Sequence, residues 1–115
     1  MTTFLGRHAD VEAHLGALRA KGLDVRVVPA ATDKEAILDA FADALDLPDW
    51  FGHNWDALVD ALRGLDGREG RPIEIVWDRV RPLRADDRET YSIVLDILEQ
   101  VADEREDLGI TVISR

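Results

Sequence analysis

The sequence contains no cysteine, so neither disulfides nor thiolate chemistry can contribute to its stability or function. It has no apolar run long enough to cross a bilayer, and its first ten residues lack the apolar core of a signal peptide. Aromatic residues make up only 6% of the chain, so any local concentration of them is informative. We therefore expect a cytoplasmic protein that makes no contact with membranes.

Basic residues are few relative to acidic ones. The 115 residues include 14 Lys and Arg but 24 Asp and Glu, which gives a formal net charge of −10. This balance argues against nucleic acid or anionic membrane as a partner, because both require basic residues that neutralise phosphate charge. It favours attraction of a basic partner and faster association with it. The length implies one domain with a single core.

Apolar periodicity predicts helices that alternate with β-branched strands. The predicted strands are 23–29, 72–78 and 110–114, and the predicted helices are 9–20, 32–45, 54–64 and 86 to about 105. Strands separated by helices indicate an α/β fold with a small three-stranded parallel sheet packed with helices. In a single domain of residues 1–115, residues 1–22 would form an N-terminal helical extension and residues 23–115 the core.

Two of these helices begin with sequences that resemble capping boxes. Thr32 with Glu35, and Asp86 with Glu89, have the spacing at which two side chains satisfy the free amides of a first helical turn. We therefore place the helix starts at Thr32 and Asp86. The residues 79–85, before the second start, are predicted to be an irregular link.

The segment 54–64 combines a short helix with a marked separation of side chains. Asn54 is a suitable N-cap and Gly64 a suitable C-terminal stop. On a helical wheel, apolar and charged residues fall on opposite faces. The apolar face carries Trp55, Leu58, Ala61 and Leu62, the charged face carries Asp56, Asp60 and Arg63, and Val59 lies at the border. The helix should bury one face and present its acidic face to solvent.

The two aspartates of this helix are four residues apart, which weakens an isolated helix by roughly 0.2–0.5 kcal/mol. Acidic residues on an exposed helix face usually serve only solubility. Here, however, Trp50, Phe51 and Trp55 lie close together next to them, with His53 in the same stretch, in a chain that is otherwise poor in aromatics. Aromatics beside charges at a junction of loop and helix are typical of a binding hot spot. The pattern favours a surface that binds a partner.

Catalytic residues are hard to find. The only serines, Ser92 and Ser114, lie outside any nucleophile elbow. His53 could act as a base, although a single loop histidine near aspartates more often contacts solvent or a partner. Asp56 and Asp60 could form an acid–base pair or hold a divalent ion, but this needs a concave pocket or more oxygen ligands. We expect no enzyme, cofactor or metal.

The sequence Trp-Phe-Gly-His-Asn-Trp-Asp-Ala-Leu-Val-Asp-Ala-Leu, residues 50–62, closely resembles the signature of the barstar family of intracellular ribonuclease inhibitors. The family pattern is an aromatic pair, glycine, any residue, asparagine, an apolar residue and Asp-Ala-Leu-x-Asp. Every fixed position is present, and the similarity extends in order from about Leu23 to Ser114. The resemblance implies a barstar-like fold and a bacterial immunity-type protein. Its partner would be a basic secreted ribonuclease of the guanyl-specific type, and the free protein would be a monomer.

The resemblance also implies roles for individual residues. Asp60 would enter the cation cluster of the ribonuclease active site, and Asp56 would pair with an adjacent cation or backbone donor. Trp50, Asn54, Trp55 and Val59 would pack around these charges and exclude water. On the long helix, the acidic contacts of the family align with Gln100 and Glu104.

Three positions depart from the family pattern. Val59 stands where barstar carries a tryptophan, and Leu65 replaces the aromatic that follows the helix. Arg63 adds a cation to the charged face, where it either neutralises Asp60 through an i, i+3 pair or meets an acidic residue of a different target.

Two other functions stay open at this point. The protein could be an adaptor or regulatory module that uses the same acidic face for a partner other than a nuclease. It could also be a small metal- or carboxylate-dependent hydrolase, which a divalent ion ordered at Asp56 and Asp60 would support. Strongly salt-dependent association with a basic ribonuclease would favour the inhibitor.

Overall fold

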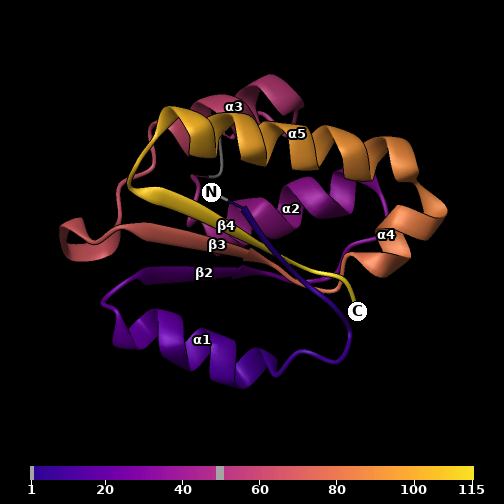
Figure 1. The fold of residues 1–115 in the computed structure, drawn as a ribbon. Coiled ribbons are helices and arrows are strands. Elements are labelled where there is room, and N and C mark those ends of the chain that lie inside the picture. The colour runs from indigo at the N-terminus through magenta and orange to yellow at the C-terminus, as the bar shows by residue number, and fades with distance from the viewer. Residues whose placement is uncertain (1, 49–50) are drawn as a thin grey trace.

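A computed structural model describes residues 2–48 and 51–115 of the chain. Its centre is a parallel sheet of four strands in the spatial order β1-β4-β3-β2 (Figure 1). The strands are β1 Thr2–Leu5, β2 Asp24–Val28, β3 Ile73–Trp77 and β4 Leu108–Ile113. The predicted α/β fold with a parallel sheet is confirmed, whereas the prediction of three strands is wrong.

Strand β1 is the element that the sequence pattern did not predict. It pairs with β4, from Thr2 opposite Ile110 to Leu5 opposite Ile113, and forms one edge of the sheet. Four residues are too few to show the alternation that indicates a strand, and the pairing partner lies at the other end of the chain. Residues 2–22 therefore contain a strand as well as a helix, which corrects the purely helical extension.

In the described residues the chain forms five α-helices and one 3₁₀ turn. The helices are α1 Val11–Ala20, α2 Lys34–Ala44, α3 Trp55–Arg63, α4 Arg81–Asp86 and α5 Arg88–Glu104, and the 3₁₀ turn is Arg68–Gly70. Figure 1 shows α1 on one face of the sheet and α2, α3 and α5 on the other. No helix in the described part of the chain is both long and apolar enough to span a membrane.

Two helix starts and one link differ from the sequence prediction. Helix α2 is capped by Asp33, whose side chain accepts the backbone N–H of Ala36 at 2.8 Å, one residue beyond the expected start. Likewise, α5 is capped by Asp87, whose carboxylate accepts both the N–H and the hydroxyl of Thr90. An aspartate can cap as well as the residue before it, so composition alone did not choose between them. The predicted irregular link 79–85 is largely helical instead, because α4 begins at Arg81 and ends at Asp86. A helix of this length is too short to show periodicity in the sequence.

Two apolar layers hold the helices against the sheet. The larger layer lies between the sheet and helices α2, α3 and α5, and the smaller one lies beneath α1. Strand β3 supplies both, because Ile75 and Trp77 point into the larger layer and Val76 into the smaller. Leu58 and Leu62 of α3 have no exposed surface. Their burial fixes which side of α3 faces solvent.

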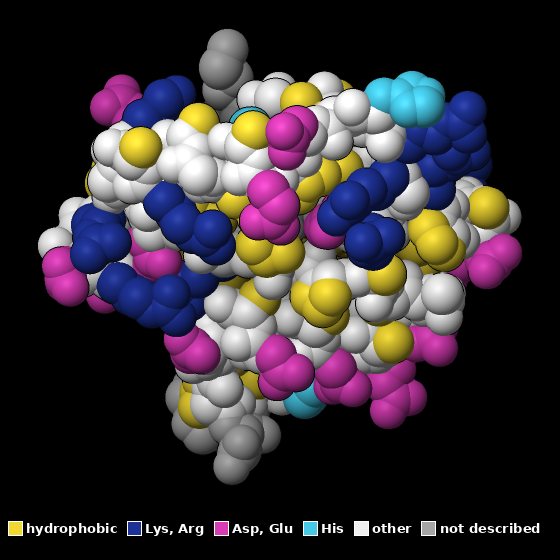
Figure 2. Space-filling model, turned by 90° about the horizontal axis from the view of Figure 1, so that it is seen from below, with side chains coloured by type: hydrophobic (Ala, Val, Ile, Leu, Met, Phe, Trp, Pro, Cys, Tyr) yellow, Lys and Arg dark blue, Asp and Glu magenta, His cyan; other side chains and the backbone are white. Residues whose placement is uncertain are grey.

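Helix α1 covers the sheet face opposite α3, where Figure 2 shows side chains of both charge signs, with Lys and Arg gathered at its left and right. The imidazole Nε2 of His14 lies 3.1 Å from the hydroxyl of Thr111 on β4, which in turn donates to Glu74 on β3 at 2.7 Å. This chain of hydrogen bonds joins α1 to two strands. The N-terminal segment is thus an integral layer of the domain.

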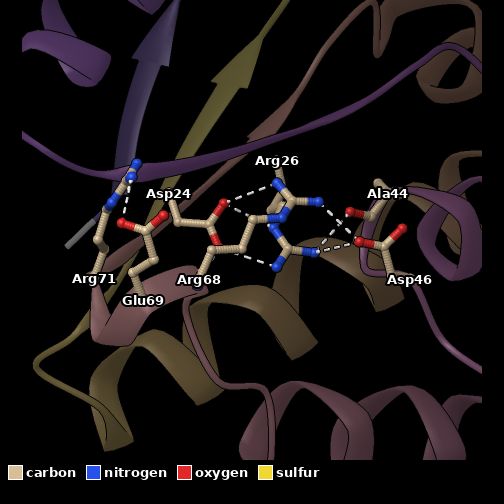
Figure 3. Close-up of polar contacts among 7 residues, drawn as sticks. All are labelled: Asp24, Arg26, Ala44, Asp46, Arg68, Glu69 and Arg71. Atoms are coloured by element: carbon tan, nitrogen blue, oxygen red, sulfur yellow. Dashed lines mark hydrogen bonds and ion pairs between the residues drawn. The ribbon is translucent and has the colours of Figure 1, made fainter.

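A buried ion pair ties β2 to two segments on either side of α3 (Figure 3). Asp24 and Arg26 have side chains only 2% and 5% exposed, and the guanidinium donates to both carboxylate oxygens at 2.9 and 3.0 Å. Arg26 also donates to the carbonyl of Ala44 at the end of α2. Asp24 accepts the backbone N–H of Arg68, in the loop after α3, at 2.8 Å. Burial acts to raise the pKa of Asp24, but hydrogen bonds from Arg26 and Arg68 outweigh it and lower that pKa.

Candidate functional site

The candidate site is built on α3, whose predicted start and apolar face are both confirmed. The side chain of Asn54 accepts the backbone N–H of Ala57 at 2.8 Å, and the helix ends before Gly64. Leu58 and Leu62 anchor it to the core. Because Asn54 caps the helix, it has a structural role whether or not it also contacts a partner.

Asp56 and Asp60 both point away from the protein. Each is exposed, and neither makes a hydrogen bond or ion pair with another side chain in the described part of the chain. Neither carboxylate is therefore used to cap the helix or to satisfy a buried group. Both retain their full capacity to accept hydrogen bonds from cationic donors of another molecule.

Arg63 pairs with the long helix α5 instead of with Asp60, which rules out the i, i+3 pair as its main contact. Its Nε and Nη2 donate to the two carboxylate oxygens of Glu104, each at 2.8 Å. Gln100 donates to the same carboxylate at 3.5 Å. Hydrogen bonds from Arg63 lower the pKa of Glu104, and this carboxylate raises the pKa of Arg63. The structure thus brings Arg63, Gln100 and Glu104 together on one side of α3.

Arg105 also holds the C-terminal end of α3, a role that the sequence did not indicate. Its Nη1 donates to the carbonyl of Leu62 at 2.8 Å and lies 3.5 Å from that of Arg63. The guanidinium is itself held by Asp107 through bonds of 2.9 and 2.8 Å, and these bonds raise its pKa. A cation at the last free carbonyls of a helix satisfies them and complements the helix dipole. Only the folded chain reveals this contact, because the two segments are far apart in sequence.

The loop before α3 is attached to α2. His53 lies 2.8 Å from the carboxylate of Asp39, and its ring packs near Phe51 with centroids 5.2 Å apart. Lys34 lies over the ring of Trp55, 5.1 Å from its centre. His53 is therefore directed toward α2 and away from the aspartates of α3. Trp50, the remaining aromatic of the predicted surface, lies outside the described residues.

A groove of about 480 Å³ runs beside α3. Most of its lining is apolar, and three aspartates also line it, among them Asp60. The lining residues are Leu45, Asp46, Leu47, Pro48, Phe51, Gly52, Ala57, Asp60, Ala61, Gly64, Leu65 and Asp66. An apolar wall with carboxylates suits a side chain that has an apolar stem and a cationic head. Within the described residues, no three His, Asp or Glu side chains are grouped as ligands of a metal ion.

Replacing Asn54 by alanine should lower the free energy of unfolding by about 1 kcal/mol, because an amide in the first turn of α3 loses its acceptor. Urea denaturation measures this loss. Asn54→Ser is the matched control, since serine caps nearly as well and should leave stability close to that of the unchanged protein. Equal losses for both variants would show that the side chain stabilises the helix in some other way.

The fold and the site define a small α/β protein that presents two exposed carboxylates on a short helix anchored to the core. The family model described as Barstar (barnase inhibitor) matches residues 25–114, which is most of the chain. This protein belongs to the barstar family. Members of that family are ribonuclease inhibitors and not enzymes, and the family implies a ribonuclease as partner. No curated protein sequence matches the chain. Strand β1 and helix α1 precede the matched segment.

Proposed function

We propose that this protein inhibits a basic, secreted bacterial ribonuclease of the guanyl-specific type and does so in the cytoplasm of the cell that makes the enzyme. The observation that carries the proposal is the outward orientation of Asp56 and Asp60 on α3, where neither has a hydrogen-bond or ion-pair partner among residues 2–48 and 51–115. In a family of ribonuclease inhibitors, two free carboxylates on an anchored helix are suited to a cationic cleft. Inhibition requires no chemistry on the substrate, only occupation of the active site.

The mechanism follows from what a ribonuclease needs. Its active site must be lined by Arg, Lys and His that bind phosphate and stabilise the charge of the transition state. In the proposed complex, Asp60 takes the place of a phosphate group among these cations, and Asp56 meets a neighbouring cation or backbone donor. Trp55 and Val59 are each half-buried and would cover the charge pairs. Exclusion of water strengthens such pairs, since the effective dielectric constant falls.

The groove beside α3 adds a second contact. Asp60 and Asp66 line it together with apolar side chains from the segment between α2 and α3, from α3 and from the loop after α3. A lysine or arginine at the edge of the ribonuclease active site could enter this groove with its stem against Leu65 and its charge near Asp60. Carboxylates of the inhibitor and cationic side chains of the enzyme would then lie next to one another along the interface.

A regulatory module that binds a basic protein other than a nuclease is the second candidate. The observation that favours it is the bidentate ion pair between Arg63 and Glu104. Glu104 aligns with an acidic contact residue of the family, and here its charge is already neutralised by Arg63. Val59 also offers less contact area than the tryptophan of barstar. Such a module would bind a basic surface without blocking RNA cleavage, so a cleavage assay separates the two candidates.

Titration of the purified protein into guanyl-specific bacterial ribonucleases should abolish RNA cleavage by at least one of them at a ratio of one to one. The net charge of −10 should make association fall steeply with salt, by at least about tenfold between 50 and 500 mM. Cleavage assays and stopped-flow fluorescence measure the two quantities. Binding without loss of cleavage would instead support the regulatory module, and no binding to any member of the panel would refute the proposed target class.

A further inference from the structure

The ion pair between Arg63 and Glu104 lies at the end of the face that carries Asp56 and Asp60. Arg63 is the last residue of α3 and Glu104 the last residue of α5. Their side chains are 46% and 40% exposed, so both reach the surface on which the proposed partner would dock. The pair is therefore part of the candidate binding surface.

The hydrogen bonds of this pair determine what it can offer to another molecule. Arg63 uses Nε and Nη2 for Glu104, and its Nη1 makes no hydrogen bond within the described residues. Both oxygens of Glu104 accept from Arg63, and one also accepts from Gln100. Bidentate pairing of this kind is the strongest arrangement available to a guanidinium and a carboxylate. Glu104 is thus already engaged, while one edge of the guanidinium is free.

A second contact between α3 and the end of α5 fixes the position of the Arg63–Glu104 pair. Arg105 follows Glu104 directly and donates to the carbonyl of Leu62, one residue before Arg63. Asp107 holds that guanidinium in place. Residues 62–63 and 104–105 are therefore joined by two arginines that run in opposite directions between α3 and the end of α5. A partner meets this pair in a defined geometry, and a partner cation placed at Glu104 would face a carboxylate whose charge Arg63 already neutralises.

We propose that the Arg63–Glu104 pair is a selectivity element of the binding surface, which withholds Glu104 from partner cations and presents the free edge of Arg63 to a carboxylate or carbonyl of the correct partner. The inference rests on the proposed function, because it concerns which ribonucleases the acidic face accepts. Recognition of cations is left to Asp56 and Asp60. An enzyme with a cation opposite Arg63 is rejected by repulsion, whereas one with an acceptor there is favoured.

The test is a set of inhibition constants for the unchanged protein, Arg63→Gln, Glu104→Gln and the double variant, measured against a panel of guanyl-specific ribonucleases. Arg63→Gln should release Glu104 and remove the repulsion. It should therefore tighten inhibition of the weakly inhibited enzymes by about tenfold or more, and weaken inhibition of the best-inhibited one. Glu104→Gln leaves Arg63 without its neutralising partner, so it should weaken inhibition of the weakly inhibited enzymes by about tenfold and leave that of the best-inhibited one unchanged or tighter. The double variant should lie between the two single variants.

Arg19→Gln is the matched control, since Arg19 is exposed on α1, on the opposite face of the sheet, and the change in net charge is the same. If Arg63→Gln changes every inhibition constant by the factor found for Arg19→Gln, the pair plays no part in selection and the inference is wrong, while the inhibitor function stands. If the unchanged protein inhibits no enzyme, the proposed function and this inference fail together. Circular dichroism of each variant confirms that loss of inhibition is not loss of fold.

Discussion

Replacement of Asp60 by alanine is expected to weaken inhibition of the target ribonuclease by about 2–5 kcal/mol, or roughly 30- to 5000-fold. This is the magnitude of close charge pairs in a complex of this family. The physical reason is that the enzyme's cations, brought out of water by the complex, would be left without a counter-charge. The inhibition constant of the purified variant measures the loss.

Asp103→Ala provides the control for this prediction. Asp103 is exposed on α5, and its removal changes the net charge by the same amount. The long-range electrostatic attraction of the basic enzyme should therefore weaken to the same small extent in both variants. Only Asp60→Ala should also lose the direct contact with the cations of the active site. Equal effects of the two substitutions would mean that α3 is not the contact surface.

Replacement of Asp24 by asparagine should lower the free energy of unfolding by about 3–5 kcal/mol, the largest stability effect that we predict. The substitution preserves the shape of the side chain but removes the buried counter-charge of Arg26, whose side chain is only 5% exposed. The carboxylate that remains near Arg26 is the exposed Asp46, at 3.6 Å. It also weakens the acceptor for the N–H of Arg68, in the loop that follows α3. Urea or guanidinium denaturation measures the change.

Asp46→Asn is the control within the same network. Asp46 pairs with Arg68 at 2.8 Å and with Arg26 at 3.6 Å, but its side chain is 68% exposed. Solvent screens such a pair, so the expected loss is below about 1 kcal/mol. Similar losses for the two variants would show that burial does not set the strength of this network.

The stability that the Asp24–Arg26 pair contributes should depend on pH. Because the folded-state pKa of Asp24 is lowered, its carboxylate binds a proton less readily in the folded protein than in the unfolded chain. Its contribution to stability is therefore complete above the unfolded pKa and is lost as the pH falls through the lower, folded pKa. The difference in stability between the unchanged protein and Asp24→Asn should shrink below about pH 4.

The elements that carry local signals were predictable from the sequence. Helix α3 has a side chain that caps its first turn, a stop residue and a separation of faces within eleven residues, so Asn54, Leu58 and Asp60 lie where the pattern placed them. The strands β2, β3 and β4 carry β-branched runs and were also found, with β4 beginning two residues earlier than expected. Strand β1 was not, because its pairing with β4 depends on residues at the other end of the chain.

Part of the candidate site was likewise predictable from local sequence, and part was not. The outward orientation of Asp56 and Asp60 follows from helical periodicity and from the apolar residues opposite them. The partner of Arg63 does not, because a guanidinium on a long side chain can reach either its own helix or a neighbouring one. Packing of α3 against α5 placed Glu104 within its reach. The loop before α3 lies beside α2, which brings Asp39 within reach of His53.

By itself, the sequence determined which faces are buried, which charges are exposed and where α3 begins and ends, since these depend on residues a few positions apart. Only the tertiary structure decided which charges neutralise one another. The contacts of Arg68 with Asp24, of Arg63 with Glu104 and of Arg105 with the carbonyl of Leu62 join segments that no local spacing relates. Their geometry is fixed by how the helices and loops pack on the sheet. The available acidic surface is therefore smaller than the net charge suggests, because folding has already used some of its carboxylates.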